Sequence, residues 1–219
     1  MRLGFRWILR FPFIALLAVP GCQQQRVVRQ APLGPVPTVS EVVPENASPQ
    51  LTAFLASAAE QTKVTTGYDP SYVALKYPGG DVPPETGVCS DVLVRAFRRA
   101  GIDLQKEIHE DMTSAWSVYP HQWGAARPDS NIDHRRVPNL MTFFERRHKA
   151  LPGTNNRGDY LSGDIVAWDL GGGVEHIGII SNQISEPERH LLIIHNIGAG
   201  TRAEDVLFNW KIIGHYRFF

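Results

Sequence analysis

The order of helix-like and strand-like segments is the feature that most constrains the fold of this chain. Residues 89–101 carry apolar side chains at helical spacing, among them Val92, Ala96 and Phe97, and residues 137–149 show a second helical pattern. The C-terminal part instead holds four segments rich in branched and aromatic residues, DIVAWDL, VEHIGIIS, HLLIIHNI and IIGHYRFF. Turn residues separate these segments, as is typical of antiparallel strands. Helices that precede such a sheet predict an α+β fold.

A folded domain over residues 48–219 is predicted from the chain length and from the first helix signal. The chain has 219 residues, of which 43% are hydrophobic, which suits one domain with its own core. Ser48 has the character of a helix N-cap, and Pro49 suits the first helical position. Residues 23–47 are polar and proline-rich without apolar periodicity, which predicts a flexible linker.

An export signal is predicted over residues 1–22. Arg2, Arg6 and Arg10 precede a short apolar run, which is the charge order of a secretory signal, and the run is too short for a transmembrane helix. Its end, AVPGC, resembles a bacterial lipobox, which implies that Cys22 becomes lipidated. We therefore expect a cell-envelope protein on the periplasmic side of a membrane, held by an N-terminal lipid anchor. In a Gram-negative organism we expect the outer membrane.

Charge balance and residue patterns argue against several classes of partner. The formal net charge is zero, with 22 basic and 22 acidic residues, so nothing in the sequence predicts a basic surface for nucleic acid. The eight histidines show no His-Glu-x-x-His pattern and the two cysteines form no Cys-x-x-Cys pair, so no metal site is predicted. We expect a monomer that works without a cofactor.

Cys89 is a candidate nucleophile. If Cys22 carries lipid, Cys89 is the remaining thiol of an exported chain and has no partner for an intramolecular disulfide. It lies just ahead of a predicted helix, where backbone N–H groups and the helix dipole favour a thiolate. The alternative is that Cys89 is a small buried hydrophobe, a common role of free cysteine.

Two histidines on predicted strands are candidates for the partner of this thiol. A thiol nucleophile needs an imidazole as base and a third group that orients the imidazole. His176 and His195 both lie on apolar strands. The alternative is that each is a core histidine with backbone partners. Strand register decides whether His195 or its neighbour Asn196 faces His176, because a shift of one residue exchanges them.

The motifs around these residues resemble a known superfamily. The order GVCSDVLVRAF, SGDIVAWDLGGGVEHIGIIS and LLIIHN resembles the NlpC-type papain-like cysteine peptidases of the NlpC/p60 superfamily. Within it, TGYDPSYVALKYPGGDVPPETGVCSD, NIDHRR and IIGHYRF are similar to the bacterial domain-of-unknown-function family 1287. The resemblance covers roughly residues 50–219. It implies a papain-like NlpC-type α+β fold, in which N-terminal helices pack on an antiparallel β-sheet.

The resemblance also implies roles for individual residues. It implies Cys89 as nucleophile, His176 as general base and then acid, and His195 as the orienting third residue. Tyr77 resembles a tyrosine that lines such sites, and its alternative is a loop aromatic packed on the core. Asp91 replaces a glycine that is frequent in the superfamily; it either stabilises the first helical turn or binds a substrate amine.

Residues 131–137, NIDHRRV, concentrate charge outside any amphipathic pattern. A solvated charged turn is one interpretation. The other is that Asp133, His134 and Arg135 bind substrate, with the arginine holding a carboxylate by a bidentate pair.

The function predicted from these features is that of an exported, lipid-anchored cysteine amidohydrolase or peptidase. Export and the resemblance together suggest an amide bond in peptidoglycan stem peptides as its target. Two alternatives stay open: a catalytically silent lipoprotein that binds the cell envelope, and an acyltransferase on the same fold.

Overall fold

The computed structural model describes residues 40–42 and 47–219, all within one unit, Pro37–Phe219. The predicted signal peptide, the lipidation of Cys22 and most of the predicted linker lie outside these residues. The described residues form helices α1 (Pro49–Val64), α2 (Cys89–Arg99), α3 (Leu104–Ser114) and α4 (Val137–Arg146), and four short 3-10 helices at Trp116–Val118, Gln122–Gly124, Asp133–Arg135 and Arg157–Asp159. Their strands are β1 (Ser40–Glu41), β2 (Ile165–Asp169), β3 (Glu175–Ile184), β4 (Leu191–Asn196), β5 (Thr201–Glu204) and β6 (Lys211–Tyr216).

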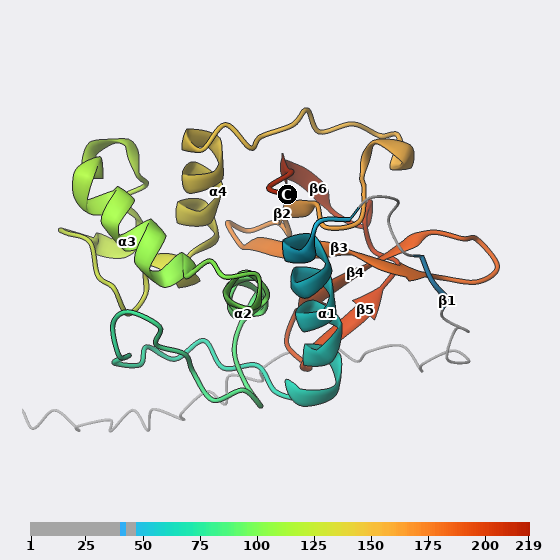
Figure 1. Ribbon diagram of the computed structural model, residues 1–219. Coiled ribbons are helices and arrows are strands. Elements are labelled where there is room, and N and C mark those ends of the chain that lie inside the picture. The colour runs from blue at the N-terminus through green and yellow to red at the C-terminus, as the bar shows by residue number, and fades with distance from the viewer. Residues whose placement is uncertain (1–39, 43–46) are drawn as a thin grey trace, which may run out of the picture. The chain divides into compact units, whose positions relative to one another are not determined.

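The strands form one antiparallel sheet in the order β5-β4-β3-β2-β6, and β1 pairs with β3. The helices precede β2 to β6 in the chain and gather on one side of the sheet (Figure 1). This confirms the predicted α+β class. Strand β1 lies in the segment predicted as a linker, so residues 40–42 of that segment are hydrogen-bonded to the sheet.

Helix α1 begins as its first residues predict. The Ser48 hydroxyl accepts a hydrogen bond from the backbone N–H of Leu51 at 3.1 Å, and Pro49 occupies the first turn. Phe54, Leu55 and Ala58 are buried against the rest of the core. None of the helices in the described ranges combines the length and the apolar run that crossing a membrane would require.

Helix α2 is the central helix of the domain. It packs against α1, α3 and the sheet strands β3 and β4 (Figure 1). Val92, Leu93 and Phe97 of α2 share the main core with Ile177 and Ile179 of β3. A second, smaller cluster contains Val166, Trp168, Ile180 and Ile193. Because successive residues of a strand point to opposite faces, Ile177 and Ile179 lie on the face toward α2, and His176 belongs to the other face.

Candidate active site

Cys89 is the first residue of α2, at the point where the helix begins. Its side chain is only 6% exposed, and burial raises the pKa of the thiol to about 11. Hydrogen bonds from backbone groups of Ile177, Ser90 and Cys89 itself lower this pKa by less than burial raises it. The expectation of a lowered thiol pKa is therefore wrong. The loss of hydration destabilises the thiolate more than the hydrogen bonds at the start of the helix stabilise it.

His176 and His195 contact each other on the face of the sheet opposite α2. His176 Nε2 lies 2.8 Å from His195 Nδ1, within hydrogen-bonding distance. The register of β3 and β4, with Ile180 opposite Ile193, places the two histidines on one face. Of the two residues that the sequence left open, His195 is thus the one that contacts His176. Asn196 points the other way and donates hydrogen bonds to the carbonyls of Gly67 and Gly87, 3.0 Å each.

Gly178 gives His195 its space. It lies on the same face of β3 as His176 and is opposite His195 in the extended register. A Cβ at this position would approach His195 Cβ to 3.2 Å and Ile193 Cγ2 to 2.9 Å. The glycine of the His-Ile-Gly motif therefore allows the two imidazoles to meet across the strands.

Burial also keeps His176 neutral. Its side chain is 3% exposed, and burial together with the nearby charge of His195 lowers the pKa of His176 to about 3. The ring of Trp168 stacks on it, with centroids 5.8 Å apart, and Trp210 contacts both histidines edge-on. At neutral pH this imidazole is uncharged, with one protonated and one unprotonated ring nitrogen, and aromatic rings surround it.

The structure brings Cys89 to β3 without joining the thiol to His176. Within the described residues the Cys89 thiol and His176 share no hydrogen bond, and the thiol lies against the backbone of Ile177, the next residue along β3. The neutral thiol lies on the face of β3 toward α2, and the neutral imidazole of His176 lies on the opposite face. They do not form a thiolate–imidazolium pair at rest.

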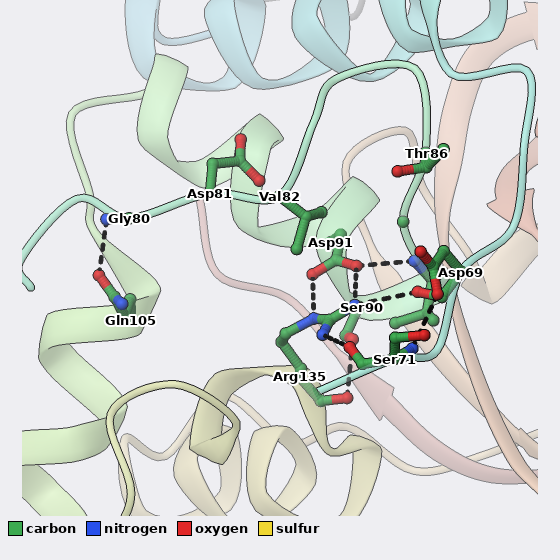
Figure 2. A network of polar contacts seen from close by, with 12 residues as sticks. Asp69, Ser71, Gly80, Asp81, Val82, Thr86, Ser90, Asp91, Gln105 and Arg135 are labelled. Carbon is green, nitrogen blue, oxygen red and sulfur yellow. Dashed lines mark hydrogen bonds and ion pairs between the residues drawn. The ribbon is translucent and has the colours of Figure 1, made fainter. Parts of the chain in front are cut away.

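Asp91, in the first turn of α2, forms a buried ion pair with Arg135 (Figure 2). Arg135 Nε and Nη2 donate to the two Asp91 carboxylate oxygens at 2.9 and 3.0 Å. Asp91 Oδ2 also accepts from the backbone N–H of Val88 at 2.7 Å, which caps α2. Arg135 further donates to the carbonyls of Ser71 and Asp69. The network thereby ties the start of α2 to residues 69–71, and the predicted substrate-binding groups of Asp91 and Arg135 bind each other.

Asp133 and His134 are buried as well, at 2% exposure each. Asp133 accepts from the backbone N–H of Asp129 and contacts His109 Nδ1 at 2.9 Å. Burial lowers the pKa of His134 to about 4, and its Nδ1 has no partner among the described residues. The interpretation of this segment as a solvated turn is therefore wrong for residues 133–135, which pack into the protein.

A pocket of about 190 Å³ opens beside Cys89. Its walls include Tyr68, Trp123, Arg136 and Glu175. Burial, and after it the charges of Cys89 and Asp91, raise the pKa of Tyr68 to about 12, which reflects its nearness to the cysteine. The sequence did not indicate Tyr68, because it shares a loop rich in turn residues with Tyr72 and Tyr77.

Tyr77 does not take the position that the resemblance implied. It is absent from the residues that line the pocket at Cys89, and its ring packs edge-on against His109 with centroids 5.2 Å apart. Tyr77 is 39% exposed, so it is a loop aromatic but does not pack on the core as the alternative expected.

Arg136 is one of the two arginines that line the pocket. Its guanidinium carbon lies 4.9 Å from the centre of the Trp123 ring, a cation–π contact. In the described part of the chain Arg136 makes no ion pair, whereas its neighbour Arg135 is bound to Asp91. The two adjacent arginines cannot be told apart from the sequence, because only the structure shows which of them has a carboxylate partner.

A metal site does not emerge from the described ranges. Residues 40–42 and 47–219 contain no cluster of three or more His, Cys, Asp or Glu side chains that could hold an ion.

Comparisons with known proteins agree on a family. A family model described as "Domain of unknown function (DUF1287)" matches residues 55–218. A protein of Escherichia coli (strain K12), described as "Uncharacterized protein YijF", is 54% identical over 167 residues, which cover 76% of this chain and 81% of that protein.

A solved structure from Staphylococcus aureus subsp. aureus Mu50, described as "similar to lipoprotein, NLP/P60 family", aligns with a TM-score of 0.40 and 14% identity. The alignment covers 84% of this chain and 44% of that chain, so this chain spans less than half of its length. The family model and the identity to the Escherichia coli protein show that the chain belongs to the DUF1287 family.

Proposed function

We propose that this protein is an exported cysteine peptidase or amidase of the cell envelope, held by a lipid on Cys22, that cleaves an amide bond in peptidoglycan stem peptides. The observation that carries the proposal is the placement of Cys89 in a pocket at the start of α2, beside the strand that bears the His176–His195 pair. The motif resemblance to NlpC-type peptidases supplies the reaction class and the substrate.

The proposed reaction begins with neutral groups and requires His176 Nδ1 to come within reach of the thiol, which lies on the other face of β3 in the resting structure. His176 accepts the thiol proton as Cys89 sulfur attacks the substrate carbonyl and forms a carbon–sulfur bond. His176 then returns this proton to the departing amine when the carbon–nitrogen bond breaks. Water, deprotonated by His176, hydrolyses the thioester and frees Cys89. The backbone N–H of Cys89, which the helix leaves without an intrahelical partner, is proposed to stabilise the oxyanion, with the Tyr68 hydroxyl as second donor.

The test is digestion of purified peptidoglycan and of isolated stem peptides by the full chain, with products identified by mass spectrometry. Cys89→Ala is the matched control, since it removes only the sulfur at a buried position. We expect new fragments with the wild type and none with the variant. Fragments from both proteins, or from neither, would remove the proposal. A product joined to an added amine acceptor would identify acyl transfer instead.

A catalytically silent binding lipoprotein is the second candidate, and the raised pKa of the Cys89 thiol favours it. Intact envelope material that binds the chain without being cut, with Cys89 resistant to alkylation at neutral pH, would support this reading.

Arg136 is proposed to bind a substrate carboxylate at the rim of the pocket, in place of Arg135. Arg136→Met is expected to raise KM by about 10- to 100-fold with little change in kcat, because it removes a charge-assisted contact made equally before and during reaction. Arg157→Met, which removes a guanidinium that is paired with Asp205 at 2.9 Å, is the control. An unchanged KM, or an equal loss with both variants, would contradict this role.

A further inference from the structure

We propose that Glu204 is a positioning residue of this site, whose carboxylate fixes the tautomer of His195 and, through it, that of His176. The effect of Glu204 on turnover rests on the proposed function. The effect of Glu204 on the tautomers of the two histidines is independent of that function.

The contact follows from the pairing of β4 with β5. In this register His195 lies opposite Arg202 and Ile193 lies opposite Glu204, so the side chains of His195 and Glu204 share one face. Glu204 Oε2 lies 3.0 Å from His195 Nε2. The His195 side chain is 1% exposed and that of Glu204 is 36% exposed. The Glu204 carboxylate is therefore the solvent-facing end of a series of hydrogen bonds whose two histidines are buried.

The hydrogen-bonding capacity of each group then sets the tautomers. An ionised carboxylate only accepts hydrogen bonds, so His195 Nε2 must carry the proton. In neutral His195 this leaves Nδ1 as an acceptor, and the 2.8 Å contact requires that His176 Nε2 carries the proton. In neutral His176 the unprotonated nitrogen is therefore Nδ1. His176 Nδ1 takes no part in the hydrogen bonds that link Glu204, His195 and His176, so it is the nitrogen that can act as base.

The carboxylate also bears on the charged state of the pair. When His176 takes a proton, the positive charge lies two hydrogen bonds from Glu204, among the rings of Trp168 and Trp210. A low-dielectric surrounding strengthens the attraction of the carboxylate for this charge. Arg202, on the same strand as Glu204, opposes this attraction with its own positive charge. The hydrogen bond with His195 lowers the pKa of Glu204, and the charge of Arg202 lowers it by a smaller amount.

The neighbouring residue offers a matched control. Asp205 Oδ2 contacts His190 Nδ1 at 2.7 Å, which is also a carboxylate–imidazole pair at the edge of the sheet. The side chains of His190 and Asp205 are 34% and 30% exposed, and neither lines the pocket at Cys89. Asp205→Asn therefore removes the carboxylate that contacts His190, at the position that follows Glu204, and leaves the contacts of the His176–His195 pair in place.

The experiment compares Glu204→Gln, Glu204→Ala and Asp205→Asn in the full chain labelled with nitrogen-15 in its histidines. Ring nitrogen chemical shifts report the tautomers of His176 and His195. We expect single tautomers in the wild type and in Asp205→Asn, and mixed tautomers at His195 in both Glu204 variants. With a cleaved substrate in hand, kcat/KM should fall about 10- to 100-fold in the Glu204 variants, the range seen for carboxylates that orient metal-binding histidines.

The outcomes separate the two proposals. Tautomers unchanged by both Glu204 variants would overturn the positioning role, whatever happens to the rate. Tautomers that change while kcat/KM holds would overturn its catalytic part. A wild type that cuts no substrate, with His195 tautomers that still depend on Glu204, would remove the proposed function and leave the positioning role standing.

Discussion

Replacement of Arg135 by methionine is expected to lower the free energy of unfolding by about 3–5 kcal/mol, because it leaves the Asp91 carboxylate buried without its counter-charge. Arg135 and Asp91 are 7% and 3% exposed, so water cannot take over the role of the guanidinium. Two further acceptors, the carbonyls of Ser71 and Asp69, lose their donors. Urea unfolding followed by circular dichroism measures the change.

A double-mutant cycle separates the pair from its surroundings. Asp91→Leu combined with Arg135→Met should cost less than the two single changes added, since no lone charge then stays buried. Arg157→Met serves as the control, because its pair with Asp205 has the same 2.9 Å separation but is 30% exposed on both sides, and should cost at most about 1 kcal/mol. If the two single arginine variants lost equal stability, the buried pair would not hold the start of α2 as inferred.

Local patterns in the sequence were enough for the fold class and for part of the candidate site. Strand periodicity and helix signals depend on neighbouring residues, so the α+β order and the Ser48 cap could be predicted. The pair of His176 and His195 could be proposed because both interrupt apolar strands. Their catalytic roles stay predictions.

The remaining features depend on contacts between distant segments. Asp91 and Arg135 are 44 residues apart, and each alone fits a helix cap or a substrate contact. Glu204 reaches His195 only through the β4–β5 register. Tyr68 and Tyr77 share one loop, and only the path of that loop brings Tyr68 to Cys89. Burial, which reverses the expected pKa shift of Cys89, is likewise a property of the assembled core.

Replacement of His176 by glutamine is expected to lower kcat/KM by about 10²- to 10⁴-fold, the usual contribution of a positioned general base. Glutamine fills a similar space but cannot accept the thiol proton. Cys89 of this variant should still react with an irreversible inhibitor whose reaction needs no general base. This reaction would show that the pocket is intact. A variant with wild-type kcat/KM on the identified substrate would contradict the role of His176.

The same substitution is expected to change how stability depends on pH. The pKa of His176 is lowered to about 3 from an ordinary value of about 6.5, so the folded state binds this proton more weakly than the unfolded state. Its contribution to stability is then fully present above about pH 6.5 and is lost as the pH falls toward about 3.

In urea unfolding at a series of pH values, His176→Gln should lose less stability on acidification than the wild type does. The slope of its unfolding free energy against pH should be smaller by up to the value for one bound proton. His148→Gln, at an exposed histidine, is the control for the loss of an imidazole as such. Equal acid slopes in the wild type and in His176→Gln would mean that His176 is not held neutral. Proton transfer from a resting thiol to a resting imidazole would then lose its physical basis.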